Sequence, residues 1–325
     1  MAFPNGWRPM PPLDRDFIEC LSLFGHQLCP NHYQAVLGLA REEFGTYRGV
    51  GLEQLLTRME AFSLNMRLYA EAGTDDHQQL INDGLLREFR EKTACARSAV
   101  VEVLSRLTTQ TIEGDIGTLA ERSRHGSWHT RLAAQCQDGD TIASFNYDTM
   151  IDHSIKWERP WLWAPEGGTY GQPVLFSPNG RWVRRKDVQR GLVEILKLHG
   201  SIHFCSSDRG PQLVEDPVQN PDPLIIPPVF GKPIEEWAFL SQVWRRAAGR
   251  ISETTALVVV GYSAPTADQR AQALLGAKGK PLEFILILNP SREDANHVLS
   301  LFSRRIQADT IIAIRPGLED LFEFV

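Results

Sequence analysis

Three features are scarce in this sequence: paired cysteines, long apolar runs and an excess of positive charge. The five cysteines include no Cys-x-x-Cys pair, which argues against a zinc knuckle and a disulfide framework and is typical of a reducing compartment. No run approaches the roughly 20 apolar residues that a membrane-spanning helix needs, and the first residues contain no apolar signal-peptide core. We therefore expect a cytoplasmic protein with no membrane segment and no zinc.

Length, charge and composition narrow the class of protein. With 325 residues the chain fits one large or two modest domains, and 42% hydrophobic and 23% charged residues are usual for a globular protein. The net charge of −6 argues against a nucleic-acid-binding surface over the whole chain. One basic run, Arg181 to Lys186, leaves a local nucleic-acid patch open, although a solvated loop is the favoured interpretation.

The hydrophobic pattern divides the chain into two parts. One helix is expected to begin near Asp14 and another near Asn31, and apolar residues then recur at helical spacing over 51–60 and 76–107. This pattern predicts that residues 31–138 form a helical block. Residues 157–190 are irregular and rich in glycine, proline and tryptophan, so they either cover a site or pack their own tryptophans.

Short apolar runs that end in Gly, Pro, Asn or Asp follow the helical block. The expected strands are 141–145, 193–198, 224–226, 256–260, 284–288 and 310–314, and helical patterns lie at 234–248, 267–275 and 292–304. This alternation predicts an α/β fold with a doubly wound, mainly parallel sheet. The runs around Val259 and Ile287 are apolar on both faces, which predicts buried strands.

Polar side chains follow several of the expected strands. In an open parallel sheet, ligands bind outside the carboxyl ends of the strands, so these residues are candidates for one site. Because Asn and Asp are also ordinary turn formers, a single polar strand end says little and the whole set says more. The candidates are Asn146 with Asp148, His199, Gly261 with Ser263, and Asn289 with Ser291.

Several segments, in this order, resemble one family. "SFNYDTMID", "LKLHGSIHF", "PLIIPP" followed by a tryptophan, "VVVGYSAPTAD" and "LILNPS" are together similar to the sirtuin-like NAD hydrolases of bacteria, a diverged branch of the silent-information-regulator fold found in anti-phage defence systems. The resemblance covers about residues 140–291, and "GVGLEQLL" in the helical block is also similar. It implies a Rossmann-like core formed by residues 1–30 and 139–325, with residues 31–138 as a helical insertion.

The resemblance implies that the protein cleaves NAD, its substrate, to nicotinamide and ADP-ribose. Asn146 would hold the water or the ribose hydroxyls, and His199 would act on the hydroxyls and the water, because an imidazole titrates near neutral pH. Asp148 would orient its neighbours. Each residue also has a purely structural alternative. His199 could be a hydrogen-bonded histidine at the start of a helix or turn, and Asp148 could form a helix cap or an Asx turn.

The binding residues follow in the same way. Gly261 would let the backbone approach a phosphate, Ser263 would donate to it, and Asn289 resembles a contact to the adenosine ribose. His203, four residues after His199, would share a metal only on a helix, and this segment is expected to be a strand end and loop, so no metal site is expected. The expected NAD-binding residues are Gly261, Ser263, Asn289, Ser291, Tyr147 and Gly200.

One element of the family is not seen. The family opens with a strand and a glycine-rich loop that cradle the pyrophosphate, whereas "FPNGWRPMPPLDRDF" resembles the segment after that loop. Either Met1 is not the natural start, which we favour, or the strand is lost, which would leave two central strands without partners. The alternative function is a catalytically inactive binding or scaffold subunit of a defence complex. The resemblance also implies a homo-oligomer or a defence-system partner protein.

Overall fold

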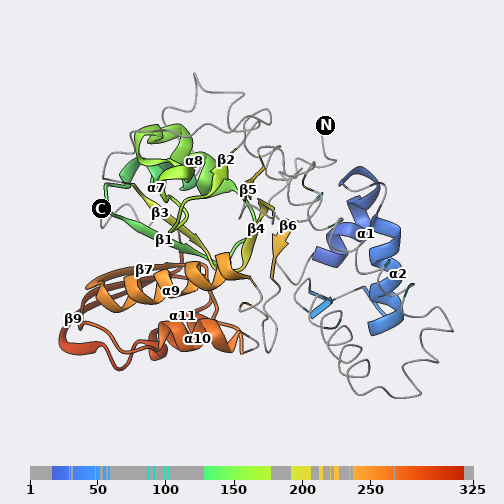
Figure 1. Cartoon of the computed structure of the whole chain (residues 1–325). Helices are drawn as coiled ribbons and strands as arrows, with labels where there is room; N and C mark the ends of the chain where they lie inside the picture. The colour runs from blue at the N-terminus through green and yellow to red at the C-terminus, as the bar shows by residue number, and fades with distance from the viewer. Residues whose placement is uncertain are drawn as a thin grey trace, which may run out of the picture.

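A computed structural model gives the architecture of the chain (Figure 1). It describes residues 17–28, 30, 32–47, 49–51, 54–55, 58, 87, 91, 99, 102, 128–176, 192–205, 212–214, 220, 223–226, 234, 237–266 and 268–317. Within these residues the chain is a mixed α/β protein with parallel sheets and helices. The expected cap Asp14, the basic run from Arg181 to Lys186 and most of the helical block lie outside the described residues.

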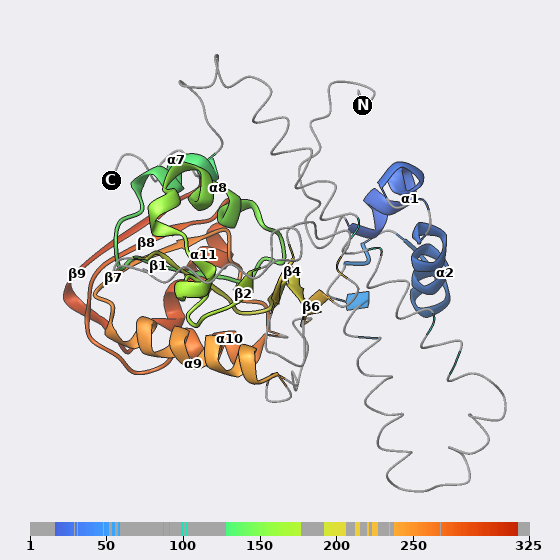
Figure 2. The same ribbon diagram turned by 45° about the horizontal axis from the view of Figure 1, so that its top comes forward.

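Two parallel strands form the first sheet. Strand β1 (Thr141–Ser144) pairs with β3 (Glu194–Lys197), and every residue of β3 is buried. Helices α7 (Trp128–Gln135) and α8 (Met150–Glu158) lie on one side of this pair, and α9 (Ala238–Glu253) lies on the other (Figures 1 and 2). Coverage on both sides explains why the β3 run is apolar apart from its two charged ends.

A three-stranded parallel sheet follows in the order that the apolar runs predict. It consists of β7 (Ala256–Val260), β8 (Leu282–Leu288) and β9 (Ile306–Arg315), connected by α10 (Gln269–Leu275) and α11 (Arg292–Leu301). Strand β8 is buried as expected. The prediction of a buried β7 is wrong, because Val258 is 43% exposed and no described strand pairs with β7 on the side away from β8.

The third sheet is mixed and corrects one expectation. It has the order β2 (Leu175–Phe176), β5 (Gln212–Leu213), β4 (Gly200–Cys205) and β6 (Pro223–Ile225), and β4 is antiparallel to β5 and β6. The segment Gly200–Cys205 was expected to be a strand end and loop, but it is a strand buried up to Phe204. Its alternating polar residues are buried because each finds a polar partner inside the protein.

The remaining described helices lie at the start of the chain and around α8. Helices α1 (Phe17–Leu28) and α2 (Tyr33–Phe44) pack on each other beyond β6 (Figures 1 and 2). Short 3-10 turns at Pro160–Leu162 and Pro165–Gly167 follow α8, where Trp161 is 63% exposed and Trp163 packs against the core. None of the helices in the described ranges is both long and apolar enough to cross a membrane.

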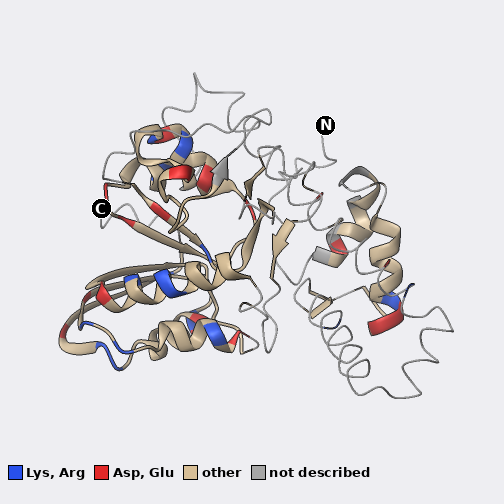
Figure 3. Ribbon diagram, viewed as in Figure 1, with Lys and Arg blue, Asp and Glu red and all other residues tan. Residues whose placement is uncertain are grey.

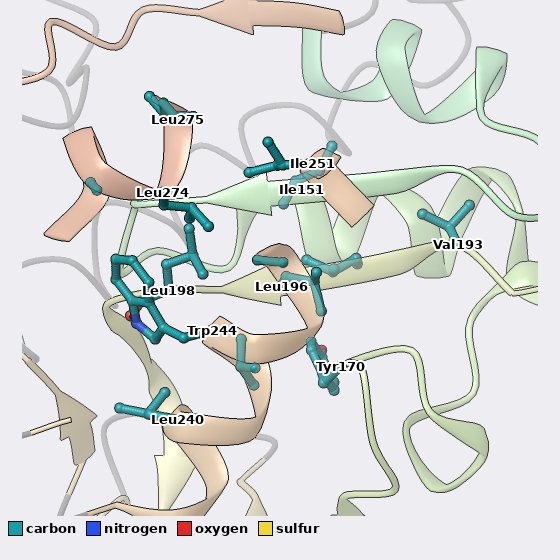
Figure 4. Packing of buried hydrophobic residues seen from close by; sticks show 14 of the residues in the cluster. Ile151, Tyr170, Val193, Leu196, Leu198, Leu240, Trp244, Ile251, Leu274 and Leu275 are labelled. Atoms are coloured by element: carbon teal, nitrogen blue, oxygen red, sulfur yellow. The ribbon is translucent and has the colours of Figure 1, made fainter. Parts of the chain in front are cut away.

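Helix α9 packs against strand β3 of the first sheet in the main hydrophobic core. Figure 4 shows Trp244 of α9 beside Leu198, which directly follows β3. The indole Nε1 of Trp244 donates a hydrogen bond to the Leu198 carbonyl at 2.6 Å, so the buried ring is both packed and satisfied. This contact fixes the turn after β3, where His199 lies.

Glu194 at the start of β3 provides a second attachment for α9. Its carboxylate accepts hydrogen bonds from Arg246 Nη2 and Arg250 Nε, each at 2.6 Å, and basic residues line this helix in Figure 3. Burial alone would raise the pKa of Glu194, but the hydrogen bonds and charges of Arg250 and Arg246 outweigh it and hold the pKa below its ordinary value of 4.5.

We predict that Glu194→Gln lowers the free energy of unfolding at pH 7 by about 1–2 kcal/mol, since the arginines are partly solvated and lose a charged acceptor. A carboxylate with a lowered pKa stabilises the fold above its unfolded pKa, and this contribution disappears as the pH falls through the folded pKa. In urea titrations the difference between wild type and Glu194→Gln should therefore shrink as the pH falls below the ordinary pKa of 4.5, and disappear once the pH lies below the lowered pKa of the folded state. The exposed control Glu283→Gln should show no such pH dependence.

Candidate functional site

The segment after β1 is fixed by hydrogen bonds to β4 and to the residue that follows β6. The Tyr147 carbonyl accepts hydrogen bonds from Ser201 Oγ at 2.9 Å and from the Ile202 amide at 3.1 Å. The Tyr147 hydroxyl donates to the Ile226 carbonyl at 3.0 Å. Residues separated by more than 50 positions in the sequence are thus joined at the carboxyl end of β1, as expected for SFNYD and KLHGS.

His199 lies at the centre of this region, in the turn between β3 and β4. Its Nε2 lies 2.9 Å from Oδ2 of Asp268, and both side chains are buried. The ring centroid lies 5.2 Å from that of Phe145 and 6.1 Å from that of Tyr147, the two residues that flank Asn146. A carboxylate at Nε2 favours the tautomer with its proton on that nitrogen and orients the ring.

Asn146 and Asp148 differ in their surroundings. Asn146 is exposed, and its backbone amide donates to Ser144 Oγ at 3.2 Å. Asp148 Oδ1 accepts from the amide of Met150, the first residue of α8, at 2.9 Å. This contact is an Asx turn, the non-catalytic role that the sequence also allows for Asp148. One carboxylate oxygen therefore holds the start of the helix. The orienting role of Asp148 stays a prediction.

The end of β7 meets the end of β1 through two aromatic rings. Tyr262 stacks on Phe145 with centroids 4.3 Å apart and an interplanar angle of 13°. Gly261 has a left-handed φ of 64°, and its amide donates to the Leu288 carbonyl at 2.8 Å. The exposed Ser263 follows. These two expected phosphate contacts therefore lie at a bend after β7, beside the His199 region.

Asn289 and Ser291 have internal partners. The buried Asn289 side chain donates to the Tyr262 carbonyl at 3.2 Å and accepts from the Ser291 amide at 2.9 Å. Ser291 Oγ accepts from the Asp294 amide at 3.2 Å, which caps the start of α11. Asn289 thus joins the ends of β7 and β8, and both side chains have a structural reason to be polar. Their predicted contact with NAD stays a prediction.

Gly200 is explained by packing. Its φ is 79°, and a Cβ atom there would lie 1.9 Å from the Leu224 carbonyl oxygen of β6. No side chain fits between these backbones, so glycine is required for β4 to begin directly after His199. Gly200 therefore sets the position of His199 through the backbone, and its predicted contact with NAD stays a prediction.

The two histidines of the HGSIH segment face different carboxylates. His203 Nε2 lies 3.8 Å from Oδ1 of Asp152 in α8, whereas His199 faces Asp268. Burial, partly opposed by the charge of Asp152, lowers the pKa of His203 to about 3, so this imidazole is neutral. Within the described ranges, no group of three His, Cys, Asp or Glu side chains is arranged to hold a metal ion.

A buried polar cluster lies next to the site. Lys197 Nζ is 3.2 Å from Asp152 Oδ2 and also donates to the Asp148 carbonyl. Burial alone would raise the pKa of Asp152, but the charge of Lys197, helped by His203 and Tyr170, holds it below its ordinary value. Burial, reinforced by Asp152, raises the pKa of Tyr170 well above 10. We name Asp152, Lys197, His203 and Tyr170 the polar cluster.

Three residues at the site were not singled out from the sequence. Asp268 lies inside the segment 267–275 that was expected to be helical and directly precedes α10, where an Asp is a helix N-cap signal that the sequence offers. Lys197 and Asp152 lie inside the quoted segments, but nothing in their spacing indicates that they pair. Their contact depends on how α8 folds back over β3, which only the tertiary structure shows.

We predict that Asp268→Ala destabilises the protein by about 1 kcal/mol more than Asp268→Asn. Asp268 Oδ1 accepts from the Ala271 amide at 3.2 Å and caps α10, and asparagine retains a cap acceptor while it removes the charge that faces His199. Urea denaturation at pH 7 measures the two free energies of unfolding. Equal values for the two variants would show that the cap contributes nothing.

Taken together, these contacts define what the region can do chemically. An imidazole oriented by a carboxylate is suited to proton transfer, and an exposed amide on the adjoining turn is suited to hold a polar ligand. The positive-φ glycine and exposed Ser263 at the next strand end provide backbone and hydroxyl groups for an anion. Neither a scan against protein-family models nor a search of curated proteins finds a match for this chain.

Proposed function

We propose that this protein hydrolyses NAD to nicotinamide and ADP-ribose. The observation that carries the proposal is the buried contact between His199 and Asp268, at the strand ends where SFNYD, KLHGS and GYS converge. Three of the segments that resemble sirtuin-like NAD hydrolases meet there through side-chain contacts rather than through sequence order alone. The residues around the contact are polar groups and aromatic rings, as a dinucleotide site requires.

In the proposed reaction, water attacks C1′ of the nicotinamide ribose while the bond from C1′ to the ring nitrogen breaks. The bonding electrons pass to the cationic ring nitrogen, which leaves as neutral nicotinamide. Asn146 positions the water or the ribose hydroxyls, and His199 accepts the proton that the water loses. Asp268 stabilises the imidazolium that forms, in the way that a carboxylate orients the base of other acid–base pairs. The adenosine half lies along Gly261, Ser263 and Asn289.

We further propose that the parallel strands belong to one doubly wound, Rossmann-like sheet. Among the described residues, β1 has a partner only in β3 and β7 only in β8, so each has one open edge. The stacking of Phe145 on Tyr262 brings the carboxyl ends of β1 and β7 together. One more parallel strand between them would complete the sheet, and the family places its first strand and glycine loop in that position.

The wider role follows from the resemblance. We propose an effector that depletes NAD in anti-phage defence, acting in the cytoplasm as a homo-oligomer or with a defence-system partner. A catalytically inactive scaffold subunit remains the competing function, because the described residues include no glycine-rich pyrophosphate loop. The two functions differ in one measurable property: both bind NAD, but only the enzyme releases nicotinamide.

We predict that Asn146→Ala and His199→Ala each lower NAD turnover by about 100-fold or more, which is the usual contribution of a positioned acid–base group. Chromatographic measurement of nicotinamide and ADP-ribose gives the rates. The control Asn296→Ala, an exposed asparagine on α11, should leave the rate unchanged. Full activity in both site variants would refute the assignment of these residues.

Calorimetry with NAD separates the enzyme from the scaffold. The binding measurement is made on this chain, in parallel with chromatography of released nicotinamide. Binding with turnover supports the enzyme. Binding without turnover would overturn the proposed hydrolase and favour the scaffold.

A further inference from the structure

Within the part of the chain that the structure describes, the polar cluster brings together four buried ionisable groups that the proposed reaction does not use. Lys197 is 1% exposed, Asp152 4% and His203 5%, and Tyr170 is 1% exposed. They come from α8, from the end of β3, from the middle of β4 and from the turn after Pro165–Gly167. The cluster therefore joins four segments, and it contacts the turn that carries Asn146 through Lys197 and the Asp148 carbonyl.

Only one pair in the cluster carries charge. His203 is neutral because its pKa is lowered to about 3, and Tyr170 keeps its proton because its pKa is raised. Asp152 is ionised, so it is the counterion of the Lys197 ammonium at 3.2 Å. A buried ion pair of this kind contributes little net stability, and removal of one partner is strongly destabilising. The pair therefore matters more for the position of the groups that it contacts than for the stability of the fold.

Lys197 holds the backbone of the candidate site. Its ammonium donates to the Asp148 carbonyl, while Ser201 Oγ and the Ile202 amide donate to the adjacent Tyr147 carbonyl. Two consecutive carbonyls of the turn are thus held from the β3–β4 side. Because Lys197 is two residues before His199, the same short segment carries the proposed base and holds the turn that carries Asn146.

We propose that Lys197, with Asp152 as its counterion, is a positioning residue that fixes the 146–148 turn relative to His199. The proposal rests on the proposed function for its catalytic consequence, since Asn146 must lie at one fixed place to orient water. The geometric part, that the ammonium immobilises the turn, does not depend on which reaction the site performs. The two parts can be tested separately.

The experiment compares wild type with the double variant Lys197→Met/Asp152→Asn. The double change removes both charges together, so no unpaired ion remains in the interior to prevent folding. Ile155→Val is the matched control, because Ile155 is fully buried in the same helix as Asp152 and its side chain has no polar group to bind the ammonium. Thermal unfolding confirms that all three proteins are folded at the temperature of the measurements.

Hydrogen exchange gives the first readout, on peptides that span residues 144–150. We expect exchange in this segment to become at least about 10-fold faster in the double variant, with exchange in β7 and β8 unchanged. Ile155→Val should leave exchange over 144–150 as it is in wild type. Unchanged exchange over 144–150 in the double variant would overturn the proposal, whether or not the protein acts on NAD.

NAD turnover gives the second readout. We expect kcat to fall at least about 10-fold in the double variant with KM within about 2-fold of wild type, since the turn positions a reacting group and the rest of the substrate still binds. Equal kcat in wild type and the double variant would overturn the catalytic part. If wild type itself releases no nicotinamide while exchange quickens as expected, the proposed hydrolase fails and the immobilisation of the turn by Lys197 stands.

Discussion

The arrangement of the site depends on one constraint: a buried ammonium must have its acceptors around it. Lys197 meets this requirement with the Asp152 carboxylate and the Asp148 carbonyl, and in doing so it holds α8, β1 and β3 in one mutual position. The same rule operates at Arg305, where a buried guanidinium donates to the carbonyls of Lys280, Ile251 and Thr254. In both places a charged side chain joins segments whose apolar packing alone would tolerate small shifts.

A second kind of contact shapes the candidate site: single polar side chains link the ends of different strands. Asp268 caps α10 with one oxygen and faces His199 with the other, so the start of a helix and the orientation of the imidazole are set by one side chain. Asn289 similarly joins the ends of β7 and β8. Site geometry and helix starts are therefore coupled, and they cannot be changed independently.

Much of the framework followed from the sequence, and the part that did not has a physical cause. The bounds 256–260 match β7 at both ends because valines stop at a glycine, and α11 begins at Arg292 because Ser291 caps it. The burial of β4 was not predictable, since Ser201 and His203 look solvent-exposed until Tyr147 and Asp152 supply partners from elsewhere. Among the site residues, the meeting of SFNYD and KLHGS was predictable from strand order, whereas the pairing of His199 with Asp268 depends on tertiary packing.

The stack of Phe145 on Tyr262 has a consequence for how the protein can be divided. Asn146, Lys197 and His199 are all encoded before α9, and Gly261, Asp268 and Asn289 are all encoded after it. A fragment that ends ahead of α9 would carry the imidazole without its carboxylate, and the complementary fragment would carry the carboxylate without the imidazole. The contact between His199 and Asp268 therefore requires both parts of the chain, and the stack of Phe145 on Tyr262 is a second contact between the same two parts.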